Sequence, residues 1–254
     1  PIAKIAAKLA VGYSLDELKN DITNRTLAAF EPTIDYIVTK LPRFDFEKFS
    51  SASGKLGVQM QSVGEAMAIG RTFRESFQQA YRSLELNLPG FETKDPREDD
   101  KDIKRFRELD IKSLNDGSAF RMLKVKEAIK QEYSIDEIHK NTGIDPWFLR
   151  EIQEIVNIEK EHFSLKNLEY LKKNGFSDLQ IARLNNIEED EVRKMRINQG
   201  IIPVFKLVDT CAGEFEAETP YSYSTYESMN DLKPLNGKKI MILGGGPNRI
   251  GQGI

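Results

Sequence analysis

The carboxyl-terminal part of the sequence carries the residues with the clearest chemical meaning. The run GGGPNRIGQG occupies residues 244–253 and follows the apolar run IMIL at residues 240–243. Glycines let a backbone approach a ligand closely, and Arg249 can meet an anion. Short apolar runs are typical of buried parallel strands, whose carboxyl ends form the usual ligand-binding edge of an α/β sheet. We therefore expect a strand over residues 240–243 and a ligand-facing loop after it.

The glycine-rich loop departs from both common phosphate-binding patterns. Arg249 takes the place of the third glycine when a G-x-G-x-x-G pattern is counted from Gly244. Gln252 takes the place of the lysine when a Walker A loop is counted from Gly246. An ordinary dinucleotide or P-loop site is therefore disfavoured, and a structural turn between strand and helix is the competing interpretation.

Other residues that often carry chemistry lack suitable neighbours. Glu85 and Asn87 have the spacing of a metal-binding pair, but no third carboxylate lies close by in the sequence. The two histidines, His139 and His162, lie on polar-rich helices and have no partner at metal-ligand spacing, so we expect them at the surface. Cys211 has no histidine nearby, and we expect it to be buried and unreactive. We assign no catalytic residue and no metal ligand to this chain.

Composition and charge argue against several classes of protein. Apolar residues make up 39% and charged residues 30% of the sequence, and the net charge of -3 gives no bulk attraction to nucleic acid or anionic membranes. No apolar run reaches the roughly 18 residues of a membrane span. Lys4 and Lys8 interrupt the first apolar stretch, unlike a signal peptide. A single cysteine forms no intrachain disulfide, and we expect a reducing cytoplasm without nucleic-acid or membrane partners.

The first third of the chain shows a mixed α and β pattern. Apolar residues at helical spacing, a capping-box pattern and short apolar runs mark its elements. The expected elements are helices over residues 2–11 and from Ser14 to Glu17 onward, strands over 34–41 (ended by Pro42) and 63–69 around a loop at 51–62, and an amphipathic helix over 72–86 whose stripe is Phe73, Phe77, Ala80, Tyr81 and Leu84.

A change in composition after residue 88 predicts a domain boundary. Residues 95–110 are crowded with charges of both signs near Pro89, Gly90 and Pro96. Residues 98–199 then have an all-helical pattern. The expected helices cover residues 98–109, 117–131, 135–141, 146–162, 165–173, 178–184 and 189–198, and they are followed by strands over 204–208 and 221–226 and a linker over 231–239.

An internal repeat with a period of 43 residues lies inside the helical region, where residues 134–152 align without gaps on residues 177–195. Each unit is predicted to be two helices joined by a tight turn, with Ser134 and Ser177 as N-caps. Trp147 stands at the start of a helix in the first unit, where we expect it to anchor the core. The other matched pairs are Glu137 with Gln180 in the capping box, Gly143 with Asn186 at the turn, and Ile138/Ile181, Ile144/Ile187, Leu149/Val192 and Ile152/Met195 in the core.

The two helix-turn-helix units raise the alternative of DNA binding. A recognition helix must approach phosphates with basic or neutral residues. The second unit instead opens its second helix with EEDE at residues 188–191, and the first places Asp145, Glu151 and Glu154 around Arg150. A DNA duplex would repel these side chains, so packing or contact between copies is the favoured role.

Several stretches together resemble the large subunit of carbamoyl phosphate synthetase. The loop at residues 244–253 is similar to the one that opens the second half of that protein, and SVGEAMAIGRT at residues 62–72 is similar to the end of its first ATP-grasp unit. The match follows the family's order along the whole chain and diverges mainly around residues 87–130. The other matching runs are PIAKIAAKLAVG at 1–12, DPWFL at 145–149, DTCA at 209–212 and YSTYE at 223–227.

This resemblance implies an α+β fragment of a multi-domain protein. Residues 1–85 would be the carboxyl-terminal part of a carboxyphosphate-forming ATP-grasp domain, an incomplete α/β lobe. Residues 86–235 would be an all-α oligomerisation domain, and residues 236–254 would begin a carbamoyl-phosphate-forming α/β domain with its first strand. On this interpretation the chain bridges two synthetase halves.

The family makes carbamoyl phosphate from bicarbonate, glutamine-derived ammonia and two ATP, for arginine and pyrimidine synthesis. The resemblance implies a parent ligase that uses ATP, Mg or Mn, and K. Its partners would be a glutaminase small subunit, the rest of the large subunit and further copies bound through the helical domain. The metal ligands and clamping arginines of the first ATP site would lie before Pro1, and the second ATP site beyond Ile254. We therefore expect the isolated chain to bind no cofactor and to be inactive.

The resemblance also suggests a role for the glycine-rich loop. It would face the carbamate-handling side of the second active site, with Asn248 and Arg249 as candidates for contact with an anion. The candidate residues are Gly244, Gly245, Gly246, Asn248, Arg249, Gly251 and Gln252.

Three alternatives to this role remain open at the level of sequence. An independent helix-turn-helix protein would bind nucleic acid, and a purely structural module would only make interactions. A biotin-carboxylase-like ATP-grasp relative would suit the strand over residues 63–69 and the helix after it. It would not suit a long helical region followed by a new strand and a glycine-rich loop.

Overall fold

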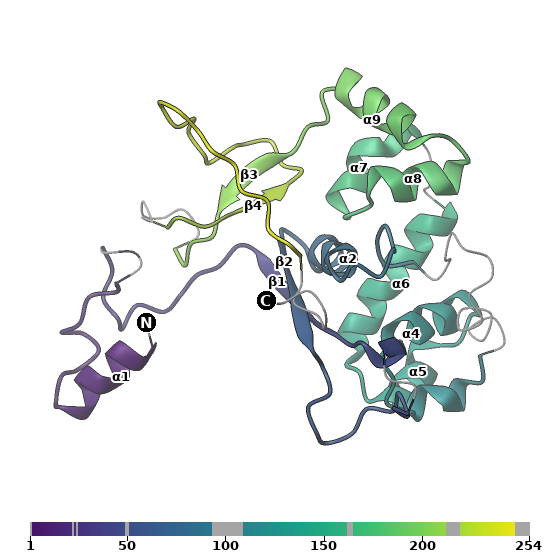
Figure 1. Cartoon of the computed structure of the whole chain (residues 1–254), viewed down its shortest axis with the longest axis horizontal. Helices are drawn as coiled ribbons and strands as arrows, with labels where there is room; N and C mark the ends of the chain where they lie inside the picture. Colours follow the sequence, from purple (N-terminus) through teal and green to yellow (C-terminus); the bar gives the residue numbers. More distant parts are fainter. Residues whose placement is uncertain are drawn as a thin grey trace.

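Two small antiparallel sheets and a body of helices make up the described part of the chain (Figure 1). The structure is a computed structural model and describes residues 2–21, 23, 25–48, 51–92, 109–161, 165–211 and 219–246. Within those ranges no helix combines the length and the apolar character needed to cross a membrane. The arrangement is that of an α+β protein with a helical domain, as the sequence predicts.

The first sheet pairs strand β1 (Ile37–Arg43) with strand β2 (Gly64–Gly70) in antiparallel register, with Ile37 opposite Gly70. The expected end of the first strand at Pro42 is wrong, because β1 continues through Pro42 to Arg43. The sheet has two strands, so β1 needs hydrogen bonds on one side only, and an edge strand tolerates the missing N–H of proline.

Helix α2 (Phe73–Ser83) follows β2 directly and confirms the predicted amphipathic helix. Thr72 caps its start, since its side chain accepts a hydrogen bond from the backbone N–H of Glu75 at 3.2 Å. The predicted stripe points inward: Phe77, Ala80, Tyr81 and Leu84 are buried, and Phe73 packs against them.

Among the described residues before the sheet, one helix forms rather than two. Helix α1 (Ile2–Ala10) confirms the first prediction, although none of its side chains is buried. The helix expected from Ser14 is wrong. The backbone N–H of Ser14 does donate to the Glu17 carboxylate at 2.9 Å, but the chain makes only a turn there. Short helices need tertiary packing, and Leu15 is 43% exposed.

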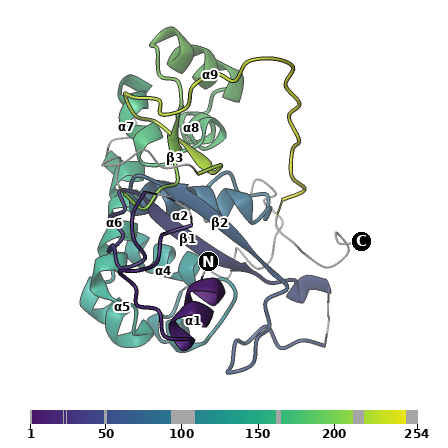
Figure 2. The ribbon, with the colours of Figure 1, turned by 90° about the vertical axis from the view of Figure 1, so that its left-hand side faces the viewer.

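The helical body begins at residue 111 and contains the repeat (Figure 2). The expected helix over residues 98–109 lies outside the described residues except for Leu109, and the one expected over 117–131 is shorter at its start. The elements are the 3-10 helices η2 (Ile111–Asn115) and η3 (Leu165–Asn167) and the α-helices α4 (Arg121–Lys130), α5 (Ile135–Thr142), α6 (Pro146–Glu161), α7 (Leu168–Lys173), α8 (Asp178–Asn185) and α9 (Glu189–Asn198); a further 3-10 helix, η1 (Phe46–Lys48), follows β1.

The predicted repeat is confirmed in both units, α5–α6 and α8–α9. Ser134 and Ser177 accept hydrogen bonds from the backbone N–H groups three residues later. Gly143 and Asn186 are left-handed, with φ of 68° and 54°, as the turns require. The reciprocal capping bond forms only in the first unit. In the second, Gln180 is fully buried and its amide donates to the side chain of Gln78 at 3.1 Å.

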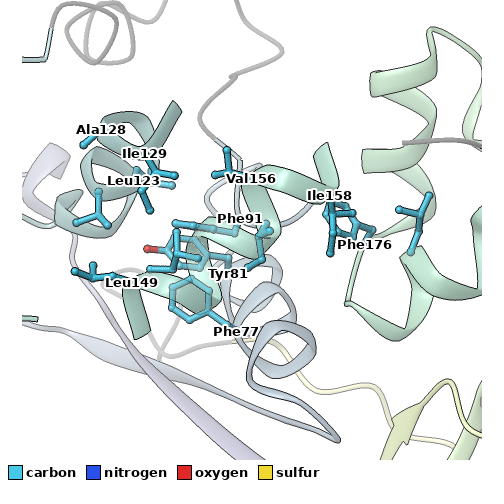
Figure 3. Close-up of a cluster of buried hydrophobic side chains, with 14 of the residues drawn as sticks. Phe77, Tyr81, Phe91, Leu123, Ala128, Ile129, Leu149, Val156, Ile158 and Phe176 are labelled. Atoms are coloured by element: carbon cyan, nitrogen blue, oxygen red, sulfur yellow. The ribbon is translucent and has the colours of Figure 1, made fainter. Parts of the chain in front are cut away.

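One continuous core joins the first sheet to the helices. Phe91 packs between two residues of α2, with its ring centroid 4.8 Å from that of Phe77 and 4.7 Å from that of Tyr81 (Figure 3). The buried cluster runs from Ala66 in β2 to Val192 in α9. The boundary expected after residue 85 therefore falls inside this core, and the division into domains stays a prediction.

The second sheet is a hairpin of β3 (Val204–Leu207) and β4 (Ser222–Thr225), close to the predicted strands. The strand expected over residues 240–243 is wrong. These residues form no strand, and their four side chains are at least 85% exposed. No described strand lies alongside to satisfy their backbone groups and cover their side chains, so the apolar run alone does not produce a strand.

Candidate functional site

The glycine-rich loop does not form a phosphate cradle in the part of it that the structure describes. Residues 247–254 lie outside the described residues, and with them Asn248, Arg249, Gly251 and Gln252. Gly246 has a φ of 81°, and a side chain there would collide with the carboxylate of Glu85. A carboxylate at this position repels phosphate oxygens, so Gly246 as described does not fit a phosphate group, whereas no atom lies within 4 Å of a Cβ placed on Gly244.

The other residues singled out from the sequence also remain apart. Glu85 and Asn87 follow α2 in left-handed conformations, with φ of 53° and 60°. Among the described residues, no group of three histidine, cysteine, aspartate or glutamate side chains is placed to hold a metal ion. The exposed His139 has its Nδ1 2.7 Å from the carbonyl oxygen of Ile144, across the turn of the first repeat unit, and His162 lies outside the described residues. Cys211 is buried, as expected.

The prediction that Trp147 anchors the core is wrong, because this side chain is 44% exposed. Its ring lies 5.4 Å from Phe73 and 5.0 Å from Phe148 in edge-on contacts. Together with Val38 and Leu41 of β1, these rings line an open apolar groove of about 420 Å³. In the first turn of α6 the core position belongs to Leu149, which is fully buried, and Trp147 faces the groove instead.

A polar pocket of about 320 Å³ brings together residues that sequence reasoning missed. It lies where α2, the α7–α8 turn and the hairpin strand β4 meet, and it contains two basic side chains, Arg82 and Lys172. The rest of its lining consists of Gln79, Gly175, Phe176, Ser177, Asp178, Glu189, Pro203, Ser224 and Tyr226. These residues are spread over almost 150 positions of sequence, so no local motif reveals the pocket.

Lys172 and Asp178 form the charged floor of the polar pocket. The Lys172 ammonium donates to Asp178 Oδ1 and to the Phe176 carbonyl, each at 2.7 Å, and lies 5.1 Å from the centre of the Tyr226 ring. Arg196 donates to Asp178 Oδ2 at 2.7 Å. Burial lowers the pKa of Lys172 to about 8, against the opposing effect of Asp178. Burial also acts on Asp178, but the bonds from the two cations prevail and lower its pKa.

Glu75 links helix α2 to Arg71 and to strand β4. Its carboxylate accepts hydrogen bonds from the backbone N–H of Arg71 at 2.7 Å and from the hydroxyl of Thr225 in β4 at 2.8 Å. Burial raises the pKa of Glu75 in spite of these bonds. Gly175 packs so closely on Glu75 that a Cβ on Gly175 would lie 2.8 Å from the Glu75 Cα, and its φ of 86° also favours glycine.

The second helix-turn-helix unit begins its second helix with acidic rather than basic residues. Residues 188–191 at the start of α9 are all exposed. Val192, the next residue, is buried in the core. The first turn of α9 carries Glu189, Asp190 and Glu191, which would face an approaching phosphate backbone with like charge. This geometry does not favour nucleic-acid binding.

Comparison with known proteins identifies close relatives over the whole chain. A family model described as "Carbamoyl-phosphate synthetase large chain, oligomerisation domain" matches residues 65–200. Proteins named "Carbamoyl phosphate synthase large chain" from Neisseria meningitidis serogroup A and from Synechocystis are 54% and 53% identical over all of this chain. The "Carbamoyl phosphate synthase arginine-specific large chain, chloroplastic" of Arabidopsis thaliana is 49% identical, also over the whole chain. The chain spans 22–24% of the length of these relatives.

Proposed function

Because this chain belongs to the carbamoyl phosphate synthase large chain family, we propose that it supplies the oligomerisation domain of such a large chain and bridges its two synthetase halves. One observation carries the proposal. The family match over residues 65–200 has nearly the same limits as the buried core, which runs from Ala66 to Val192. The matched region is thus a packed unit to which short segments are attached on both sides.

The proposed reaction of the complete protein is the synthesis of carbamoyl phosphate from bicarbonate, glutamine-derived ammonia and two ATP. ATP, Mg or Mn, and K would be its cofactors, and a glutaminase small subunit would deliver the ammonia in the cytoplasm. The relative with an arginine-specific name supports arginine synthesis as one destination of the product. Pyrimidine synthesis is the second proposed destination.

In that reaction, the residues of this chain would hold the two synthetase halves together and would not themselves supply catalytic groups. Among the described residues no group of three histidine, cysteine, aspartate or glutamate side chains is placed to hold a metal ion, and Gly246 lies against the carboxylate of Glu85. Phosphoryl transfer depends on charge stabilisation by well-placed cations and metal ions. We therefore propose that the residues of the two ATP sites come from the rest of the large chain, and that residues 1–85 and 236–254 belong to the flanking synthetase domains.

Self-association of the chain tests the proposed oligomerisation domain. We expect sedimentation equilibrium of the 254-residue chain to give a mass that rises with concentration above the 29.0 kDa of one copy. A serum albumin sample at matched concentrations controls for non-ideal behaviour. A constant mass of one copy up to hundreds of micromolar would contradict the assignment.

A further inference from the structure

We propose that the polar pocket between α2, the α7–α8 turn and β4 binds a small oxyanion, a carboxylate or a phosphate, through the guanidinium of Arg82. The pocket volume of about 320 Å³ lies at the lower end of the range of ligand sites and suits a small metabolite. This proposal does not depend on the reaction of the complete protein, because it rests on the contacts of Arg82.

Arg82 is a half-buried cation without an ionic partner among the described residues. Its Nη1 donates to the carbonyl oxygen of Gly175 at 2.7 Å, and none of the described ion pairs includes it. Burial lowers the pKa of its guanidinium, against the opposing effects of Tyr226, Glu75 and Asp178. A half-buried charge in this state gains free energy from a counter-ion.

The remaining N–H groups of Arg82 are accessible to solvent, and Arg82 lines the pocket. A guanidinium has five N–H donors, of which the Gly175 carbonyl takes one. No atom of Arg82 is among the described side-chain atoms that are both buried and unbonded, so its other donors reach solvent. Two adjacent N–H groups of a guanidinium fit two oxygens of one carboxylate or phosphate.

The nearby carboxylates are already engaged by other groups. Each oxygen of Asp178 is held by a different cation, Lys172 or Arg196, at 2.7 Å. Glu75 binds the Arg71 backbone and Thr225. Neither carboxylate makes an ion pair with Arg82 among the described contacts, which leaves the guanidinium available to a ligand.

Other groups around the pocket favour a small anion over a large one. Ser224 and Tyr226 line the pocket, and the hydroxyl of such a side chain can donate to a ligand oxygen. The first turn of α8 adds its positive end, and Ser177 caps that end. Glu189 also lines the pocket and is exposed, so it repels polyanions such as nucleic acid. The expected ligand is therefore a single carboxylate or phosphate group on a small molecule.

A nuclear magnetic resonance titration of the isotope-labelled chain tests this site. Inorganic phosphate and acetate are added in separate arms, each at constant ionic strength balanced with sodium chloride. We expect saturable shifts of the Arg82 Nε–H signal and of the Gly175 and Ser177 amides in at least one arm. The arm with the tighter dissociation constant identifies the ligand class.

Variants establish that Arg82 carries the binding. R82Q should weaken binding at least about tenfold, because it removes a charge-assisted, two-point contact. R150Q, which removes an equal charge from an exposed position of α6, should leave it unchanged. R82K keeps the positive charge but lacks the two adjacent N–H groups of the guanidinium. Its dissociation constant should lie between those of the original chain and R82Q. If R82Q does not fold, the test rests on the dissociation constant of R82K and on the shifts of the Arg82, Gly175 and Ser177 signals in the unsubstituted chain. Absence of saturable shifts in both arms, or equal losses in R82Q and R150Q, would overturn the proposal.

Discussion

At the scale of single residues, the clearest energetic consequence comes from Glu92 at the edge of the core. Its side chain is buried, one of its carboxylate oxygens has no hydrogen bond, and the nearest described cation, Arg183, lies 3.8 Å from the other. Burial raises the pKa of Glu92 to about 7 against the influence of Lys126. Near neutral pH this residue therefore changes charge inside the fold.

The pKa of Glu92 predicts how stability depends on pH. A pKa raised from 4.5 to about 7 means that the stabilising contribution is complete below pH 4.5 and is lost as the pH rises through 7. E92Q removes this loss, and at pH 8 it should raise the free energy of unfolding by on the order of 3 kcal/mol relative to the original chain. At pH 4 the two proteins should be about equally stable.

Urea unfolding at a series of pH values measures the effect of E92Q. E31Q, at an exposed position, is the matched control and should run parallel to the original chain. A difference between E92Q and the original chain that stays constant from pH 4 to pH 8 would show that Glu92 does not titrate in this range.

At the scale of elements, the turns of the two repeat units depend on backbone conformation alone. Gly143 has a φ of 68°, and no atom lies within 4 Å of the position that a Cβ would take. G143A should therefore destabilise the chain by about 1 kcal/mol through left-handed strain rather than through a clash. N186G, at the matched position, should change stability by less than about 0.5 kcal/mol. Equal effects of the two substitutions on urea unfolding would contradict this account.

Elements fixed by local interactions could be predicted from the sequence, and those fixed by distant partners could not. The caps at Ser134 and Ser177 and the turns at Gly143 and Asn186 follow from residues a few positions apart. The strand expected over residues 240–243 needs a neighbouring strand, and the helix expected from Ser14 needs a packing surface. Trp147 had the expected position in its helix but not the expected environment. Apolar character alone does not say which side of an element will be covered.

At the scale of the whole molecule, the sites are harder to predict than the fold. The polar pocket draws on α2, the α7–α8 turn, α9 and β4, so its residues become neighbours only after the core has formed. The family resemblance predicted from the sequence is confirmed by relatives that are about half identical over the whole chain. The candidate anion contacts Asn248 and Arg249 stay a prediction, because they lie outside the described residues.

The whole chain should also fail to catalyse the proposed reaction by itself. We expect no bicarbonate-dependent release of ADP from ATP by the purified chain, because we propose that the residues of the two ATP sites come from the rest of the large chain. A complete large chain such as that of Neisseria meningitidis, assayed with ammonia, serves as the positive control. ADP release above that of a heat-inactivated sample would show that this chain holds a catalytic site.

The contact between Glu75 and Thr225 has a mechanical consequence. The hairpin carries the chain onward toward residue 246, while α2 belongs to the core, and the 2.8 Å bond between these two side chains fastens one to the other. The ammonium of Lys172 against the Tyr226 ring adds a second fastening one residue along. Two attachment points side by side resist rotation as well as separation. These two contacts therefore fix the orientation of the hairpin relative to the helices, and with it the direction in which the chain continues after β4.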